Sequence, residues 1–227
     1  MAIGFGAGWR RHGGDGFKLL ERPEFLSAEE CGRLIAMIDA DRAPSQTFED
    51  LSSQGHRTSE TCWMNHSDPL VEEVFARICA QLDLPAANGE RMQGQRYAPG
   101  QRFKPHHDFI RTDRPHWKEQ AKLGGQRTWT AMIFLNTPEA GGDTHFPLAG
   151  LRIAPSPGTL LAWHNLDDFG EPNPSSLHEG CEVTQGSKYI VTQWFRERPC
   201  RTPGLRAAVR RVAARSLKVI KQAFRSR

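Results

Sequence analysis

The second half of the chain is a series of short strand-forming segments, each closed by residues that favour turns. The segments expected as strands are residues 92–97, 128–135, 151–154, 159–164 and 189–195. Between them lie turn signals such as Ala98-Pro99-Gly100 and Gly141-Gly142. Several short strands punctuated in this way predict a β-sandwich or a barrel rather than a helical bundle.

Two helices are expected before these strands. Ser27 and Glu30 have the spacing of a capping box, and apolar residues then recur at helical intervals up to residue 38. A second helix is predicted from Asp68-Pro69 onward, because apolar residues again recur every three or four positions. Helices followed by strands predict a mainly-β, α+β fold in which the N-terminal helices support an all-β core.

Length and composition limit the alternatives. A chain of 227 residues fits one large domain or two small ones. It has no run of about 20 apolar residues, so no transmembrane segment is expected. Residues 1–16 contain six glycines and no apolar core of a signal peptide, and they are predicted to be a flexible arm. Five cysteines without a CxxC pair argue against a zinc ribbon and favour a reducing, cytoplasmic compartment.

The charge of the chain is divided unevenly. Residues 201–227 hold nine of the 30 Lys and Arg residues and no acid, whereas the rest has 21 bases against 26 acids, a net charge of −5. Residues 205–225 are predicted to form a basic amphipathic helix. Such a helix either docks on the acidic body or contacts an anionic membrane or a nucleic acid. The domain itself is assigned to residues 17–200, with its core at about 90–198.

Three residues carry the strongest chemical signal. His106 and Asp108 are two positions apart, so on an extended segment their side chains share a face while that of His107 points away. His178 lies between two predicted strands that can fold back beside them. Two imidazoles and one carboxylate are the facial triad of non-haem Fe(II) oxygenases. The alternative is a surface loop with a local hydrogen bond.

Lys188 stands at the start of the last apolar strand. A lysine that enters a barrel interior is unfavourable unless it meets an anion, and a dicarboxylate co-substrate would provide one. Otherwise its ammonium group reaches solvent along its flexible stem.

Six motifs in the same order resemble the prolyl 4-hydroxylase-type 2-oxoglutarate/Fe(II) dioxygenases. The resemblance covers about residues 20–198. It rests on Arg96 to Asp108, Gly124 to Thr130, Gly141-Gly142-Asp143-Thr144-His145-Phe146-Pro147, Trp163 to Leu166, Leu177-His178-Glu179-Gly180-Cys181 and Gly186 to Trp194.

The resemblance implies a double-stranded β-helix, or jelly roll, in which His106, Asp108 and His178 bind Fe(II) and act in catalysis. It implies that Lys188 binds the distal carboxylate of 2-oxoglutarate, with the hydroxyls of Tyr97 and Thr130 assisting. The expected reaction uses O2, hydroxylates an sp3 carbon and releases succinate and CO2, with ascorbate as a reductant. Tyr97 and Thr130 are also common residue types in ordinary strands.

At two positions this sequence differs from peptide-modifying members of the family, and these differences leave the identity of the prime substrate open. At Phe103 many peptide-modifying members have tyrosine, and at Arg196 they often have histidine. The first hypothesis is hydroxylation of a prolyl residue in a peptide or protein, and the second is a small molecule or a free amino acid. A third is a membrane- or nucleic-acid-binding module that acts through the basic tail. The charged segment 109–123 is expected to be either a lid over the metal or a solvated loop.

Overall fold

The computed structural model describes residues 8–14, 16–45 and 56–200. The predicted helix at 205–225 and the first residues of the predicted arm lie outside these ranges. Within them, no helix is long and apolar enough to cross a bilayer. All five cysteines are described, and each is a free thiol.

The largest element is an eight-stranded sheet whose strand order is β1-β2-β11-β7-β14-β5-β4-β3. Its centre consists of β7 and β14, which pair antiparallel from Ile190 opposite Phe134 to Trp194 opposite Thr130. The strands are β1 (Arg10–His12), β2 (Leu19–Arg22), β3 (Ala43–Pro44), β4 (Glu60–Trp63), β5 (Gln93–Tyr97), β7 (Arg127–Phe134), β11 (Leu160–His164) and β14 (Lys188–Arg196).

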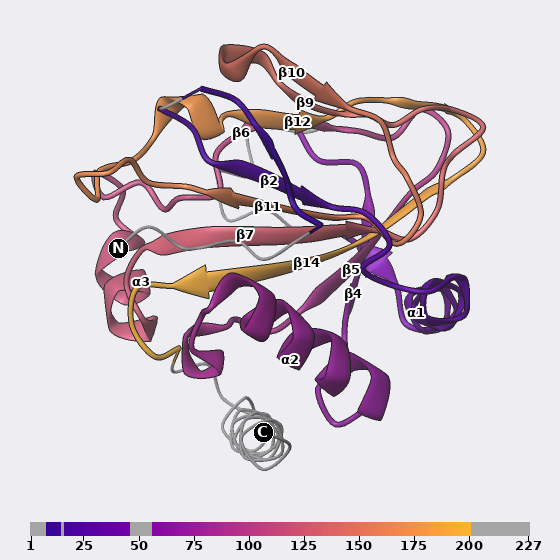
Figure 1. Cartoon of the computed structure of the whole chain (residues 1–227), viewed down its shortest axis with the longest axis horizontal. Helices are drawn as coiled ribbons and strands as arrows, with labels where there is room; N and C mark the ends of the chain where they lie inside the picture. The colour runs from indigo at the N-terminus through magenta and orange to yellow at the C-terminus, as the bar shows by residue number, and fades with distance from the viewer. Residues whose placement is uncertain (1–7, 15, 46–55, 201–227) are drawn as a thin grey trace.

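A four-stranded minor sheet, in the order β10-β9-β12-β6, covers one face of the large sheet (Figure 1). Along the chain the core strands alternate between the two sheets, which is the double Greek-key arrangement of a jelly roll. The predicted jelly roll is therefore confirmed. The minor sheet contains β6 (Phe103–His106), β9 (Thr144–Phe146), β10 (Leu151–Ile153) and β12 (His178–Gly180), and a two-stranded sheet joins β8 (Ala140–Gly141) to β13 (Val183–Gln185).

The alternation of side chains along β7 creates two separate cores. Ala131 and Ile133 belong to the cluster under the helices, whereas Met132 and Phe134 belong to the cluster between the sheets. Because successive side chains point to opposite faces of a strand, both faces of the large sheet are buried. The inner face is the one available for a site.

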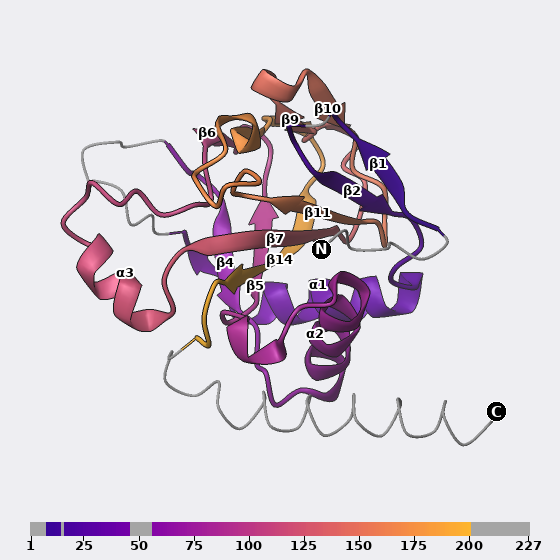
Figure 2. The ribbon, with the colours of Figure 1, turned by 60° about the vertical axis from the view of Figure 1, so that its left-hand side comes forward.

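Two helices pack on the outer face of the large sheet, away from the minor sheet (Figure 2). In α1 (Ala28–Ala40), Ser27 and Glu30 form the predicted capping box. The helix α2 (Pro69–Leu82) begins at Asp68, whose carboxylate accepts hydrogen bonds from the first backbone amides. Both helices therefore begin where the sequence predicts.

The remaining helices are short. Residues 117–123 of the charged segment form α3 (Trp117–Leu123), so half of that segment is helical rather than loop. Single 3-10 turns lie at Ala86–Asn88, Pro147–Ala149 and Pro174–Ser176.

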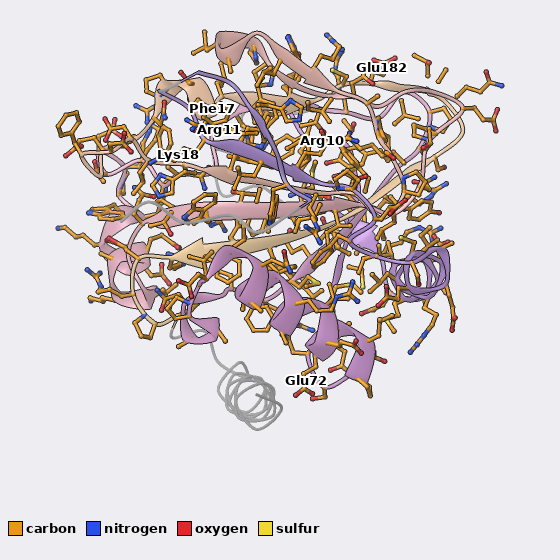
Figure 3. All side chains as sticks on the ribbon, in the orientation of Figure 1. Arg10, Arg11, Phe17, Lys18, Glu72 and Glu182 are labelled. Atoms are coloured by element: carbon orange, nitrogen blue, oxygen red, sulfur yellow. The ribbon has the colours of Figure 1, made fainter. Side chains whose placement is uncertain are left out.

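The predicted flexible arm is wrong for residues 10–12. These residues form β1, which pairs with β2, and His12 and Arg10 both contact Glu21 across the pair. Figure 3 shows Arg10, Arg11 and Phe17 along this ribbon. The glycine content suggested freedom, but long-range pairing to the sheet edge orders the segment.

Candidate metal centre and co-substrate pocket

The minor sheet brings the three predicted ligands together. His106 is the last residue of β6 and His178 is the first of β12, and the two residues are cross-strand partners. Asp108 follows β6 by two positions, and its side chain points to the same side as that of His106. His107 points elsewhere, with its Nε2 3.3 Å from the carbonyl oxygen of Pro174.

The side chains are oriented for coordination. Nε2 of His106 lies 3.9 Å from one carboxylate oxygen of Asp108, and Nε2 of His178 lies 3.7 Å from the other. Both separations exceed hydrogen-bond length, so the three groups surround a gap rather than bond to one another. Their ligand atoms all lie within 4.8 Å of each other.

Backbone carbonyls fix the protonation of both imidazoles. Nδ1 of His106 is 2.8 Å from the carbonyl oxygen of Lys104, and Nδ1 of His178 is 2.9 Å from that of Ser176. Each Nδ1 must therefore carry the proton, which leaves the Nε2 lone pair directed at the gap. This arrangement is usual for metal-binding histidines. The donor set thus fits a divalent metal ion.

Asp108 is held by a buried hydrogen-bond chain. Thr130 donates from Oγ1 to Oδ2 of Asp108 at 2.8 Å, and Asn165 donates to the Thr130 hydroxyl at 3.0 Å. Burial would raise the pKa of Asp108, but His178 and His106 nearby hold it below its usual value. The pKa of His106 is lowered well below 6.5, chiefly by burial and secondly by His178. The site therefore favours an ionised carboxylate at Asp108 and a neutral imidazole at His106, the forms that bind metal.

A pocket of about 440 Å³ extends from this triad between the two sheets. Lys188 lies on its wall and is only 2% exposed. Its ammonium group lies 5.2 Å from the ring centre of Phe134 and 5.7 Å from that of Tyr97, and its hydrogen-bond contact with Thr144 is long, at 3.5 Å. Burial lowers the pKa of Lys188 to about 8.

Among the described residues, no carboxylate forms an ion pair with Lys188. A buried ammonium group without a counter-ion is unfavourable, and an anion in the pocket would remove the penalty. The lysine thus reaches the interior rather than solvent.

The hydroxyl of Thr130 lies at Asp108 rather than at Lys188, and its role towards 2-oxoglutarate stays a prediction. Thr130 shares the inner face of β7 with Met132 but lies two residues closer to Asp108, and its hydroxyl is used there. The threonine beside the ammonium group is Thr144 of β9. Sequence reasoning missed Thr144, although the motif 141–147 contains it, because the cross-sheet contact joins residues 44 positions apart.

A second, wider groove of about 850 Å³ opens on the other side of the triad. The charged segment 109–123 supplies one wall of it, through residues such as Phe109, Ile110 and His116. Phe103 lines both hollows, and its ring stacks on His106 with 3.5 Å between ring centres. The guanidinium group of Arg57 also packs over that ring, 4.9 Å from its centre.

Buried ion pairs fix the far end of this groove. Glu90 accepts two hydrogen bonds from Arg127, at 2.7 and 2.8 Å, and lies 2.8 Å from Nε of Arg196. Burial would raise the pKa of Glu90, but the two guanidinium groups hold it below its usual value. Arg196 also donates to the backbone and side chain of Gln120 on α3. Arg196 thus fastens the 109–123 segment to the end of β14.

Residues 92–196 match the 2OG-Fe(II) oxygenase superfamily. Prolyl 4-hydroxylase 1 of Arabidopsis thaliana is 32% identical over 195 residues, which cover 77% of this chain and 67% of that protein. A protein of Acanthamoeba polyphaga mimivirus assigned to the prolyl 4-hydroxylases is 36% identical over 174 residues, covering 76% of this chain and 72% of its own.

Solved structures agree with this assignment. The viral collagen prolyl hydroxylase of Paramecium bursaria Chlorella virus-1, in complex with 2OG, matches with a TM-score of 0.62 and 27% identity over 85% of this chain and 98% of its own. A Pseudomonas putida prolyl-4-hydroxylase, at 20% identity and a TM-score of 0.53, supports the fold alone. The family uses Fe(II), 2-oxoglutarate and O2, commonly with ascorbate as a reductant. The chain belongs to the 2OG-Fe(II) oxygenase superfamily, among its prolyl 4-hydroxylase-like members.

Proposed function

We propose that this chain hydroxylates a prolyl residue in a peptide or protein, with 2-oxoglutarate as co-substrate and release of succinate and CO2. The observation that carries the proposal is the continuous space between the triad and the unpaired Lys188. It supplies a metal position and an anion position in one buried pocket of a chain related to prolyl 4-hydroxylases.

In this proposal His106, Asp108 and His178 hold the iron. Bound Fe(II) supplies the redox chemistry that couples decarboxylation of 2-oxoglutarate to hydroxylation of a C–H bond. The protein contributes two preset Nε2 lone pairs and a carboxylate whose orientation is fixed by Thr130. Three ligands on one side leave the opposite side of the ion open to co-substrate and O2.

Lys188 would bind the distal carboxylate of 2-oxoglutarate. Tyr97 shapes the pocket around this carboxylate, and Thr144 replaces Thr130 as the hydroxyl partner. A charge-assisted hydrogen bond in this buried position contributes about 1.5–3 kcal/mol. Burial also keeps bulk water away from the reacting groups.

The prime substrate would lie in the groove beside the triad. Its open side suits an extended peptide segment that presents one ring to the metal. Trp194 lines it and offers an apolar surface to a pyrrolidine ring.

A free amino acid or another small molecule is the second candidate. Phe103 supports it, because a phenyl ring has no hydroxyl to bind a peptide group and its face is already covered by His106 and Arg57. Arg196, too, is committed to Glu90 and Gln120 rather than to the groove.

Succinate release tests both candidates. Purified protein with Fe(II), 2-oxoglutarate and ascorbate is assayed with proline-containing peptides, free proline and a panel of free amino acids. Peptide-dependent succinate, with hydroxyproline found by mass spectrometry, is the expected result. Stimulation by a free amino acid alone would overturn the peptidyl substrate and leave the oxygenase chemistry intact.

The triad is tested by His178→Ala. The variant should lose turnover and retain the wild-type circular dichroism spectrum, because neither apolar core depends on the metal for its burial. Arg33→Ala, on the exposed side of α1 and away from both hollows, is the matched control. Near-normal succinate production by His178→Ala would refute the metal assignment.

Two further proposals concern the chain as a whole. Five free thiols support a reducing compartment such as the cytoplasm. The nine bases of residues 201–227 support contact with an anionic membrane or a nucleic acid.

A further inference from the structure

A group of polar residues lies on the outer face of the minor sheet, directly behind the candidate iron site. On β12 the side chain of His178 points into the pocket, so that of the next residue, Glu179, points outward. On β9 Thr144 points inward and His145 outward. Glu179 and His145 are direct cross-strand partners. Cys181, two positions after Glu179, shares this outer face.

His145, Glu179 and Cys181 converge closely. Nδ1 of His145 is 2.8 Å from Oε1 of Glu179. One nitrogen, one sulfur and one carboxylate oxygen all lie within 4.8 Å of one another. Each of the three side chains is half-buried, so the group is shielded from bulk water and open to a small ion. In Figure 1 this part of the molecule is the β9–β12 pair at the centre of the minor sheet, far from α1 and α2. Figure 3 labels Glu182, the residue after Cys181, on the same side.

We propose that His145, Glu179 and Cys181 bind a zinc ion, with water in the fourth position. Imidazole nitrogen, thiolate sulfur and carboxylate oxygen are the ligands zinc takes in proteins, and three of them with one water make an open tetrahedral site. The hard oxygen-preferring ions Mg²⁺ and Ca²⁺ are disfavoured by the sulfur and the nitrogen. The iron site contains no sulfur, so the two sites differ in the metal they prefer.

Burial raises the pKa of the Cys181 thiol, and Arg152 is the neighbour that opposes this by favouring the thiolate. Arg152 of β10 stands opposite His145 in the sheet, and its Nη1 lies 3.2 Å from Sγ of Cys181 and 3.3 Å from Oδ2 of Asp143. The guanidinium can donate to the sulfur after metal binding, while the released thiol proton passes to solvent. Such outer partners fix ligand orientation in zinc sites.

The backbone holds the ligands in place. Cys181 donates its amide N–H to the carbonyl oxygen of Asp143 at 2.8 Å, which ties the segment after β12 to the one before β9. Ligands on paired strands keep their spacing without the ion. Zinc binding would break the hydrogen bond between Nδ1 of His145 and Glu179, because two ligands of one ion lie farther apart than 2.8 Å, while the backbone spacing of the ligands is kept.

Cobalt titration of the full-length protein tests the proposal. Co²⁺ bound to a thiolate gives a strong near-ultraviolet charge-transfer band, and the His106, Asp108 and His178 site cannot produce one. Because the triad also takes a divalent ion, we expect this band to saturate by two cobalt ions per chain, one at each site, and to disappear when Zn²⁺ is added. Cys181→Ser should abolish the band, and His145→Gln and Glu179→Gln should weaken cobalt binding at least about tenfold.

Cys200→Ser is the matched control, because Cys200 is the other half-buried cysteine, and it should retain the band. Circular dichroism of each variant checks folding; if Cys181→Ser does not fold, Glu179→Gln decides. Absence of the band in the wild-type protein at saturating cobalt would overturn the proposal. A band that survives in Cys181→Ser or in Glu179→Gln with unchanged affinity would do the same. Either result leaves the oxygenase assignment untouched, since that rests on the other face of the sheet.

Discussion

The buried ammonium group of Lys188 is expected to favour binding of 2-oxoglutarate and to lower the stability of the ligand-free protein. With a pKa lowered to about 8, its protonated form disfavours the ligand-free fold at pH 7 by about 3 kcal/mol. Lys188→Met should therefore raise the urea midpoint of protein free of iron and 2-oxoglutarate. It should also raise the KM for 2-oxoglutarate roughly tenfold to a hundredfold, because the carboxylate loses its counter-charge. Lys122→Met, on the exposed side of α3, should change neither quantity.

The same residue predicts a pH dependence. Below pH 8 the ammonium group is charged and ready for the carboxylate, and above pH 8 the free protein loses that proton. The KM for 2-oxoglutarate should stay level up to about pH 8 and then rise roughly tenfold per pH unit. The sign for stability is the reverse. Between the folded pKa and the unfolded value of 10.5 the unfolded chain holds more protons, so the stability deficit against Lys188→Met should shrink as pH rises. A KM that is flat to pH 10 would contradict the role of Lys188.

Thr130 and Thr144 offer a matched comparison at the two ends of the pocket. Thr130→Val removes the hydrogen bond to Asp108, so the Fe(II) concentration for half-maximal activity should rise about tenfold or more. Thr144→Val removes the hydroxyl near the ammonium group of Lys188, so the KM for 2-oxoglutarate should rise instead. Activity measured against Fe(II) and 2-oxoglutarate concentration in both variants would show these two separate effects. The assignment fails if Thr130→Val affects only 2-oxoglutarate.

At the scale of elements, the docking of α1 depends on a missing side chain in β5. A Cβ at Gly94 would lie 2.4 Å from Cγ1 of Ile38 on α1, so Gly94→Ala should overpack this contact and destabilise the protein by about 1–3 kcal/mol. Gly32, on the exposed side of α1, has open space around a Cβ. Gly32→Ala should stabilise the helix by about 0.5–1 kcal/mol. Urea unfolding should show a lower free energy of unfolding for Gly94→Ala and a higher one for Gly32→Ala. A change in the same direction in both variants would refute the packing argument.

At the scale of the whole molecule, the sequence divides charge between a body of −5 and a tail of +9. We expect deletion of residues 203–227 to abolish retention on anionic vesicles or polynucleotide that the full chain shows at low salt. Retention of the full chain should fall as salt rises, because the attraction is screened. A deletion that lowers the unfolding midpoint and leaves retention unchanged would instead assign the tail to the fold.

Local rules predicted the parts of this molecule that are local in the chain. Ser27 and Glu30 revealed the start of α1, and the spacing of His106 and Asp108 revealed two ligands on one face. Contacts set by distant pairing were not predictable in the same way. The strand β1 depends on an edge partner, and the contacts of Thr130 with Asp108 and of Thr144 with Lys188 join residues far apart in the sequence.

The strand β14 has a consequence for how this protein can change over evolution. Lys188, Ile190, Thr192 and Trp194 form successive rungs on its inner face, from the anion end of the pocket to the groove. Two residues of a strand span about 6.6 Å, so each of these four side chains would lie beside a different part of the bound co-substrate or substrate. A substitution can alter one rung alone, whereas a single inserted residue would turn every later rung toward the helices. In the evolution of this enzyme, β14 can therefore change by amino-acid substitutions but not by insertions or deletions.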